Sequence, residues 1–76
     1  MKKYKLLGDI MLTFIHNNDS QSYTIGPQDG GVLESDGVTV WYIAPDGKKY
    51  ESITTANIID VSLENNKIEE VKNHES

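Results

Sequence analysis

Turn-forming residues, mainly Gly, Asn, Asp and Pro, recur along this chain roughly every eight to twelve residues. The runs between them are short and rich in β-branched and aromatic residues, which favour strands. This spacing predicts about five to seven short strands in a small antiparallel barrel or sandwich. We therefore expect one all-β domain over residues 1–72, followed by a frayed polar tail over 73–76.

The clearest predicted strand covers residues 38–43 (VTVWYI), which contain no strong helix former. A turn at 35–37 pairs it with a strand at 32–34. The Ala-Pro-Asp-Gly sequence at 44–47 forms the next turn, because Pro presets the backbone of the first corner and Gly closes it. Residues 48–53 then return antiparallel to the central strand.

The N-terminal part of the chain allows two interpretations. Apolar residues alternate over 4–16, which predicts a long strand bent at Gly8. In the same segment apolar residues also recur every four positions, which is typical of a helix. The alternative is therefore an α+β fold with an N-terminal helix at 4–16. After it we expect a turn at 17–21, a short strand at 22–25 and a flexible glycine-rich loop at 28–31.

A second hairpin is predicted near the C-terminus. Residues 58–64 are interpreted as a strand with three apolar side chains on one face, Ile59, Val61 and Leu63. Asn65-Asn66 would form a two-residue type I′ turn, because Asn tolerates the left-handed region. Residues 67–71 would then complete the hairpin.

The stretch 54–61 (TTANIIDV) resembles the end of an SH3-type barrel, in which one turn of 3₁₀ helix leads into the last strand. Ala56-Asn57 match the family pattern, whereas Thr55 stands in place of its proline and Ile58 in place of its tyrosine. The resemblance covers eight residues, and the acidic-aromatic motif and paired-tryptophan site of that family are missing. It therefore implies an SH3-like small barrel, and does not imply recognition of proline-rich peptides.

Composition narrows the range of functions. A chain of 76 residues with 37% hydrophobic residues and no Cys buries only a thin core, which favours self-association or a protein partner. The formal charge is −5, and the seven basic residues are all lysines. Because Arg supplies the bidentate grip on phosphates and bases, we expect no direct nucleic-acid binding.

Candidate catalytic and metal-binding residues are few. The sequence has no Cys and no G-x-S-x-G motif for a nucleophile. His16 could pair with Asp19 as a base, but a turn-capping role is simpler, and His74 lies in the tail. Asn17, Asn18 and Asp19 lack the spacing of a calcium loop. We therefore expect no enzyme activity, metal or cofactor.

The apolar run near the N-terminus is interrupted by Gly8, Asp9 and Thr13 and is too short to span a bilayer. No small-residue cleavage site follows it. We interpret it as part of the fold, and expect a cytoplasmic protein without a membrane partner.

Three aromatic and two acidic residues are the candidate interaction site. Trp41 and Tyr42 are neighbours on a strand and must face opposite sides, so that one is available to a partner, and Tyr50 lies across the hairpin from them. Asp60 and Glu64 would share an acidic strand edge with Ser62.

These features predict a non-enzymatic protein-interaction module that forms oligomers. One alternative is an acidic inhibitor of a basic nucleic-acid-binding protein, because short, acidic, Arg-free chains resemble accessory proteins of phages and mobile elements. The other is a small-ligand-binding barrel in which the loop at 26–31 closes over the ligand.

Overall fold

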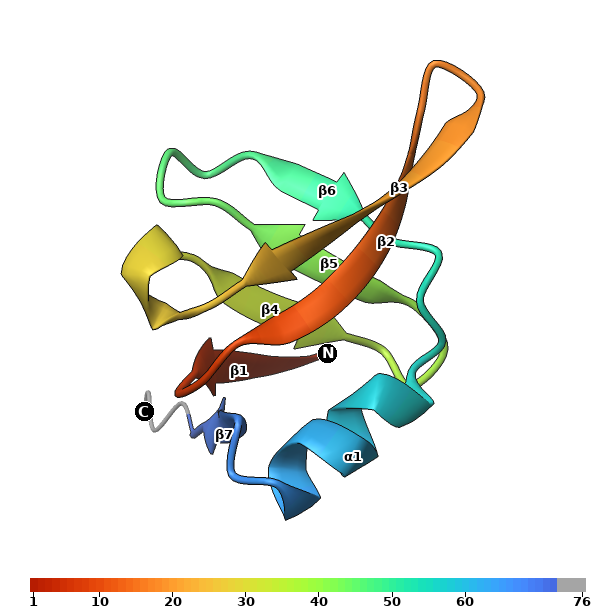
Figure 1. Cartoon of the computed structure of the whole chain (residues 1–76). Coiled ribbons are helices and arrows are strands. Elements are labelled where there is room, and N and C mark those ends of the chain that lie inside the picture. The colour runs from red at the N-terminus through yellow and green to blue at the C-terminus, as the bar shows by residue number, and fades with distance from the viewer. Residues whose placement is uncertain (73–76) are drawn as a thin grey trace.

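A five-stranded antiparallel sheet forms one layer of the computed structural model, which describes residues 1–72 (Figure 1). Its strand order is β6-β5-β4-β1-β7. The strands are β1 (Lys2–Leu6), β4 (Val32–Ser35), β5 (Val40–Ile43), β6 (Lys49–Glu51) and β7 (Ile68–Val71). The prediction of a mostly β domain is therefore confirmed.

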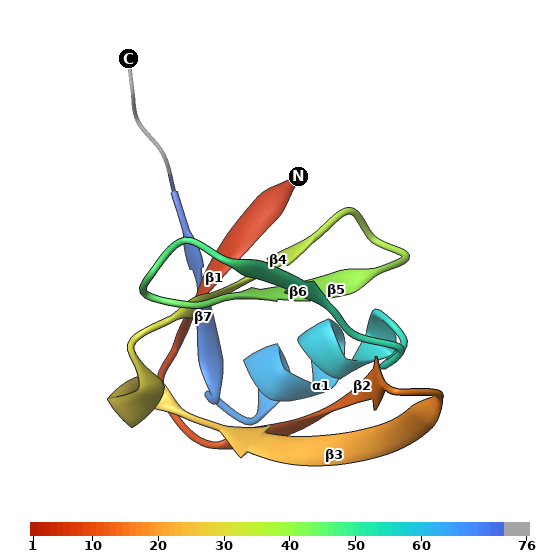
Figure 2. The same ribbon diagram turned by 90° about the horizontal axis from the view of Figure 1, so that it is seen from above.

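The second layer covers one face of this sheet (Figure 2). It consists of the hairpin β2 (Ile10–His16) and β3 (Asp19–Ile25), together with the helix α1 (Asn57–Glu64). A 3₁₀ turn, η1 (Pro27–Asp29), links the hairpin to β4. The two sheets stay separate in their strand pairing, so the β structure is not a closed barrel.

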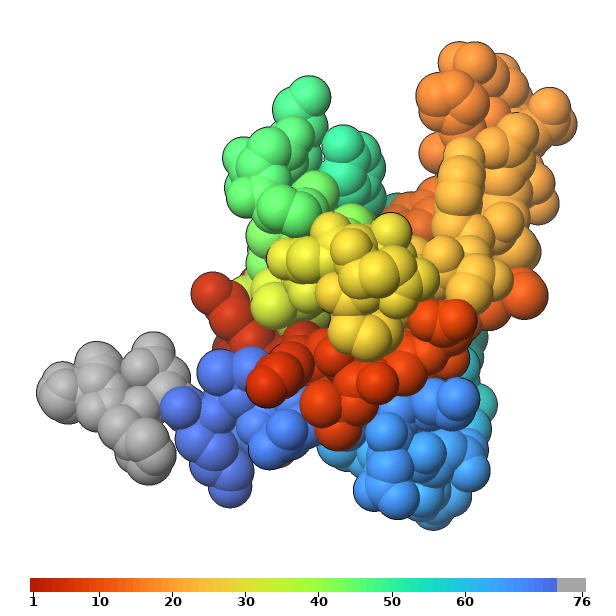
Figure 3. Space-filling view, turned by 60° about the vertical axis from the view of Figure 1, so that its left-hand side comes forward, coloured from red at the N-terminus to blue at the C-terminus, as the bar shows by residue number. Residues whose placement is uncertain are grey.

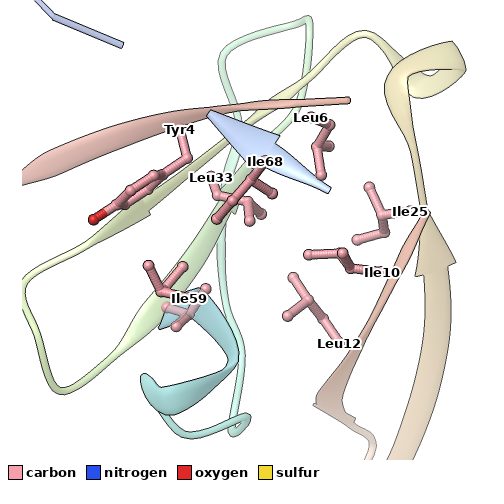
Figure 4. Close-up of a cluster of buried hydrophobic side chains, with 9 residues drawn as sticks. Tyr4, Leu6, Ile10, Leu12, Ile25, Leu33, Ile59 and Ile68 are labelled. Atoms are coloured by element: carbon pink, nitrogen blue, oxygen red, sulfur yellow. The ribbon is translucent and has the colours of Figure 1, made fainter. Parts of the chain in front are cut away.

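The core lies between the two layers, and both contribute to it (Figure 4). Successive side chains of β1 point alternately into the core and out to solvent. Tyr4 and Leu6 are therefore buried, while Lys3 and Lys5 are exposed. Each strand except β6 supplies at least one of the nine buried apolar residues: Tyr4, Leu6, Ile10, Leu12, Ile25, Leu33, Val40, Ile59 and Ile68.

The N-terminal segment is two strands, so the helical alternative for residues 4–16 is wrong. The chain leaves the sheet at the predicted bend, where the backbone N–H groups of Leu7 and Gly8 both donate to the Lys67 carbonyl, at 2.7 and 3.0 Å. The following turn is shorter than the predicted 17–21. Asn17 and Asn18 alone form it, with φ of 53° and 67°, as a type I′ turn requires.

The glycine-rich loop is also more ordered than expected. Its first part is the 3₁₀ turn η1, closed by Gly30 at φ 79°, whose N–H donates to the Pro27 carbonyl. Two predicted hairpins, by contrast, are confirmed. The strand β4 pairs with β5, with Ser35 opposite Val40, and the Ala44–Gly47 turn is closed by a 2.9 Å hydrogen bond from Gly47 N to Ala44 O.

The predicted strand at 58–64 is wrong, because these residues form the helix α1. The helix buries Ile59 and Ser62, three positions apart on one side, and exposes Val61 and Leu63. Strand propensity is overridden by tertiary context: as a helix this segment directs Ile59 and Ser62 together into the core, while β7 takes the edge of β1.

The predicted hairpin at Asn65-Asn66 is wrong for the same reason. These residues end α1 in a Schellman arrangement, in which Lys67 N donates to Ser62 O and Asn66 N to Leu63 O, at 2.8 and 3.1 Å. Asn66 does adopt the left-handed conformation, with φ 58°. The last strand β7 therefore pairs with β1 and not with its chain neighbour.

Within residues 1–72, no helix combines the length and the apolar content that crossing a membrane requires. The predicted frayed tail at 73–76 lies outside the described residues.

Candidate functional site

A cleft with a volume of about 560 Å³ opens between the β2–β3 hairpin and the β5–β6 hairpin. In Figure 3 the two hairpins stand apart, orange and green, with the region of η1 in yellow below the gap. We call this the aromatic cleft. Its lining consists of Phe14, Ile15, His16, Tyr23, Thr24, Ile25, Asp29, Tyr42, Lys49, Tyr50 and Glu51.

Four aromatic rings from two separate hairpins line this cleft. Tyr42 and Tyr50 are opposite each other in the β5–β6 register. On the other wall, Phe14 and Tyr23 form an edge-to-face pair with ring centroids 5.8 Å apart. Tyr23 and Tyr50 are about half exposed, at 48% and 45%, so a bound group would gain apolar contact area from both walls.

Tyr42 joins the cleft to the core. Its ring packs against the buried cluster, and a side chain at Gly31 would collide with that ring and its hydroxyl. Burial raises the pKa of the Tyr42 phenol, and the nearby negative charge of Asp29 raises that pKa further. The phenol is therefore neutral at ordinary pH.

Asp29 has a structural partner as well as a place in the lining. Its Oδ2 accepts a 2.8 Å hydrogen bond from the Gly26 backbone N–H, which holds the loop around η1. The chemical character of the cleft is therefore aromatic, with negative charge at its border.

The opposite face of the five-stranded sheet carries Trp41, which alternation directs away from Tyr42. The Lys49 ammonium lies 4.6 Å from the Trp41 ring centroid and 2.8 Å from Glu34 Oε1. This contact with the Lys49 ammonium lowers the pKa of the Glu34 carboxyl. Trp41 is therefore covered by side chains of its own sheet and only partly exposed.

The structure brings together two of the five predicted site residues. Tyr42 and Tyr50 share the cleft, and Tyr42 is the inward-facing member of the Trp41-Tyr42 pair. Asp60 and Glu64 are exposed on α1, away from that lining. The expectation that Ser62 shares their polar face is wrong, because on a helix it points to the core side and is buried.

Asp60 instead lines a second hollow of about 570 Å³, between the start of β1 and the first turn of α1. Lys2 and Asn57 belong to the same lining. The one aromatic residue in its lining is Tyr4, which is buried, so this hollow offers no exposed aromatic pair. We therefore regard the aromatic cleft as the better candidate.

Phe14, Tyr23 and Asp29 were not predicted as site residues. The alternation of apolar residues in 10–16, combined with a two-residue turn at Asn17-Asn18, would have placed Phe14 and Tyr23 on one face. His16 and Asp19 pair across the tip of that hairpin, whereas His74 lies outside the described residues. Among residues 1–72, no three His, Asp or Glu side chains converge on a metal-binding position.

Comparison of the chain with protein-family models, with curated proteins and with solved structures found no match.

Proposed function

We propose that this protein is a non-enzymatic interaction module that binds a segment of a partner protein in the aromatic cleft. The observation that carries the proposal is the meeting of Phe14 and Tyr23 with Tyr42 and Tyr50. The two pairs come from hairpins far apart in sequence. Aromatic side chains are enriched at the energetically important positions of protein interfaces.

The shape of the cleft supports a bound segment rather than a flat contact. Its volume of about 560 Å³ lies within the range of ligand-binding clefts. Trp41, the other candidate anchor, already lies beneath the Lys49 ammonium on an open sheet face. Asp29 is engaged by the Gly26 N–H, so the cleft offers contact surface more than a free catalytic carboxylate.

The other hypotheses drawn from the sequence remain predictions beside this proposal. They are a cytoplasmic location, self-association, the SH3-like fold group, and the two alternative functions, an acidic inhibitor and a small-ligand-binding barrel. In the structure a short helix leads into the last strand, β7, where the SH3-type pattern has one 3₁₀ turn. The last strand begins at Ile68, and not at Ile58 as the resemblance implies.

A peptide-display selection against the folded chain tests the proposal. Peptides that survive selection should shift the amide resonances of cleft residues, centred on Tyr23, Tyr42 and Tyr50, with Kd values of about 1–100 μM. Tyr50→Ser should weaken binding by about tenfold or more, because the exposed one of the two rings in that wall is lost.

Val71→Ser is the matched control for that variant. Val71 is 44% exposed, against 45% for Tyr50, and lies on the opposite edge strand of the same sheet. It should leave peptide affinity unchanged. Selection without any enriched peptide, or resonance shifts confined to the Trp41 face, would overturn the proposal.

A further inference from the structure

Hydrogen bonds tie Thr13 of β2 to the two residues Ile53 and Thr54 that follow β6, and we call this contact the seam. There Ile53 N donates to Thr13 O and Thr13 N donates to Thr54 Oγ1, both at 2.8 Å. Beyond this point the course of β2 leads away from β6 (Figure 1). The aromatic cleft lies between the hairpins to which these two strands belong. The seam therefore begins a pairing between β2 and β6 that the chain does not continue.

The free edge of β6 faces this opening. Ser52 N donates to Val40 O at 2.9 Å, so Ser52 and, two residues earlier, Tyr50 direct their backbone groups toward β5. Lys49 and Glu51 then direct their N–H and C=O groups the other way. Within residues 1–72, β6 has no strand partner on that side.

The free edge of β2 faces the same opening from the other wall. Thr13 uses its outward N–H and C=O in the seam, and alternation turns the backbone groups of Ile15, two residues later, the same way. The only strand that pairs with β2 in the described part of the chain is β3. Ile15 is 55% exposed and belongs to the cleft lining.

The charges around the opening are mainly negative. Asp29 belongs to the cleft lining, and the negative charges of Asp29 and Asp46 both raise the pKa of the Tyr42 phenol in the cleft wall. Glu51, like Lys49, alternates with Tyr50 along β6, so its side chain is directed to the Trp41 face and its backbone borders the cleft. The ammonium of Lys49 is drawn to the opposite face of the sheet by Glu34, and so does little to neutralise the opening.

We propose that the partner binds by strand addition: an extended segment enters the opening between β2 and β6 and hydrogen-bonds to one or both free edges. Its alternate side chains point between the aromatic walls, and Lys or Arg suits these positions because a cation is attracted both by aromatic faces and by the surrounding carboxylates. This inference rests on the proposed function and specifies how the partner is held.

Backbone modification of the peptide distinguishes strand addition from side-chain contact alone. The probe is the tightest peptide from the display selection, synthesised with N-methyl groups on alternate amides in two complementary sets. One set should weaken binding by about tenfold or more and the other should have little effect, because only alternate amides face a given edge. Hydrogen exchange at the amides of Ile15, Lys49 or Glu51 should slow in the complex.

A proline at the free edge gives the complementary test on the protein. The Glu51 N–H faces the opening, so Glu51→Pro removes a group that donates to no other strand within the described chain. Glu51→Pro should weaken peptide binding by about tenfold. The matched Glu51→Ala variant keeps the N–H, and its Kd for the peptide should stay within about twofold of the wild-type value. Exchange measurements on the wild-type protein decide the question if the proline variant does not fold.

The preference for basic residues is tested separately. Replacing Lys or Arg of the peptide by norleucine should weaken binding, and raising the salt concentration should weaken only the basic peptide. Binding in the cleft that is indifferent to both N-methyl sets would overturn strand addition while leaving the proposed function intact. If no peptide binds in the cleft, both the proposed function and strand addition are refuted. If a second copy of this chain pairs with the free edges instead, the inference of a basic partner is refuted.

Discussion

The exchange of Ile59 for Ala tests whether residues 57–64 stabilise the domain as a helix or as a strand. On α1, Ile59 is only 6% exposed and faces the core, whereas Val61 is 46% exposed. On a strand the two residues would share a face and would cost similar amounts to truncate. The pair of variants Ile59→Ala and Val61→Ala therefore separates the two structures.

The expected magnitudes follow from the burial of each side chain. Ile59→Ala removes three buried methyl or methylene groups, each contributing about 0.8 kcal/mol, and leaves a cavity. Ala is the better helix former by a few tenths of a kcal/mol, so the net loss should be about 2 to 4 kcal/mol. Val61→Ala removes two half-exposed groups and gains helix propensity, for a net change below about 0.5 kcal/mol.

Urea unfolding provides the measurement, followed by far-UV circular dichroism and by the fluorescence of Trp41, the only tryptophan in the sequence. A domain of this length has about 4 to 11 kcal/mol of stability, so the Ile59 variant should lose a large part of it. Its melting temperature should fall by about 10 to 30 °C. Equal losses in the two variants would refute the helical assignment.

Three further predictions concern turns and polar contacts. Asn18→Gly should stabilise the β2–β3 hairpin slightly and Asn18→Val should cost about 1 to 2 kcal/mol, because φ is 67° there; urea midpoints that move together would contradict this. Ser52→Ala should cost about 1 kcal/mol in the same assay, since it removes the 2.7 Å hydrogen bond from Ser52 Oγ to Val40 O; an unchanged midpoint would show that this bond contributes nothing. The pKa of the Asp36 carboxyl lies below its ordinary 3.8 because it accepts hydrogen bonds from Thr39 N and Val38 N. Its stabilisation is therefore complete above that ordinary pKa and is lost as the pH falls through the lower folded value. Asp36→Asn should accordingly make the free energy of unfolding less dependent on pH below about pH 4. If this free energy falls as steeply in acid as it does for the wild type, the role of the Asp36 carboxylate is refuted.

Features that depend on neighbouring residues could be predicted from the sequence. The Ala44–Gly47 turn and the pairing of β4 with β5 follow from local turn chemistry and strand propensity. The opposite orientation of Trp41 and Tyr42 follows from the alternation of any strand. Half of the candidate site, the Tyr42–Tyr50 pair, was accessible in this way.

The other half of the cleft depends on contacts between distant segments. Phe14 and Tyr23 reach Tyr42 only because the β2–β3 hairpin is held over the sheet by Thr13 and residues 53–54. No local pattern encodes which of two hairpins a third segment will touch. The predicted acidic strand edge failed for a related reason, since Asp60 lies on a helix.

What the sequence by itself determined is a β-rich chain, the Ala44–Gly47 turn with the pairing of β4 and β5, and the opposite faces of Trp41 and Tyr42. These depend on backbone preferences within a few residues. Only the tertiary structure decided that 57–64 is a helix, that Tyr42 faces inward, and that β2 and β6 part beyond the seam. These outcomes depend on which strand edges are already paired and which face of the sheet needs cover, and that competition involves the whole chain.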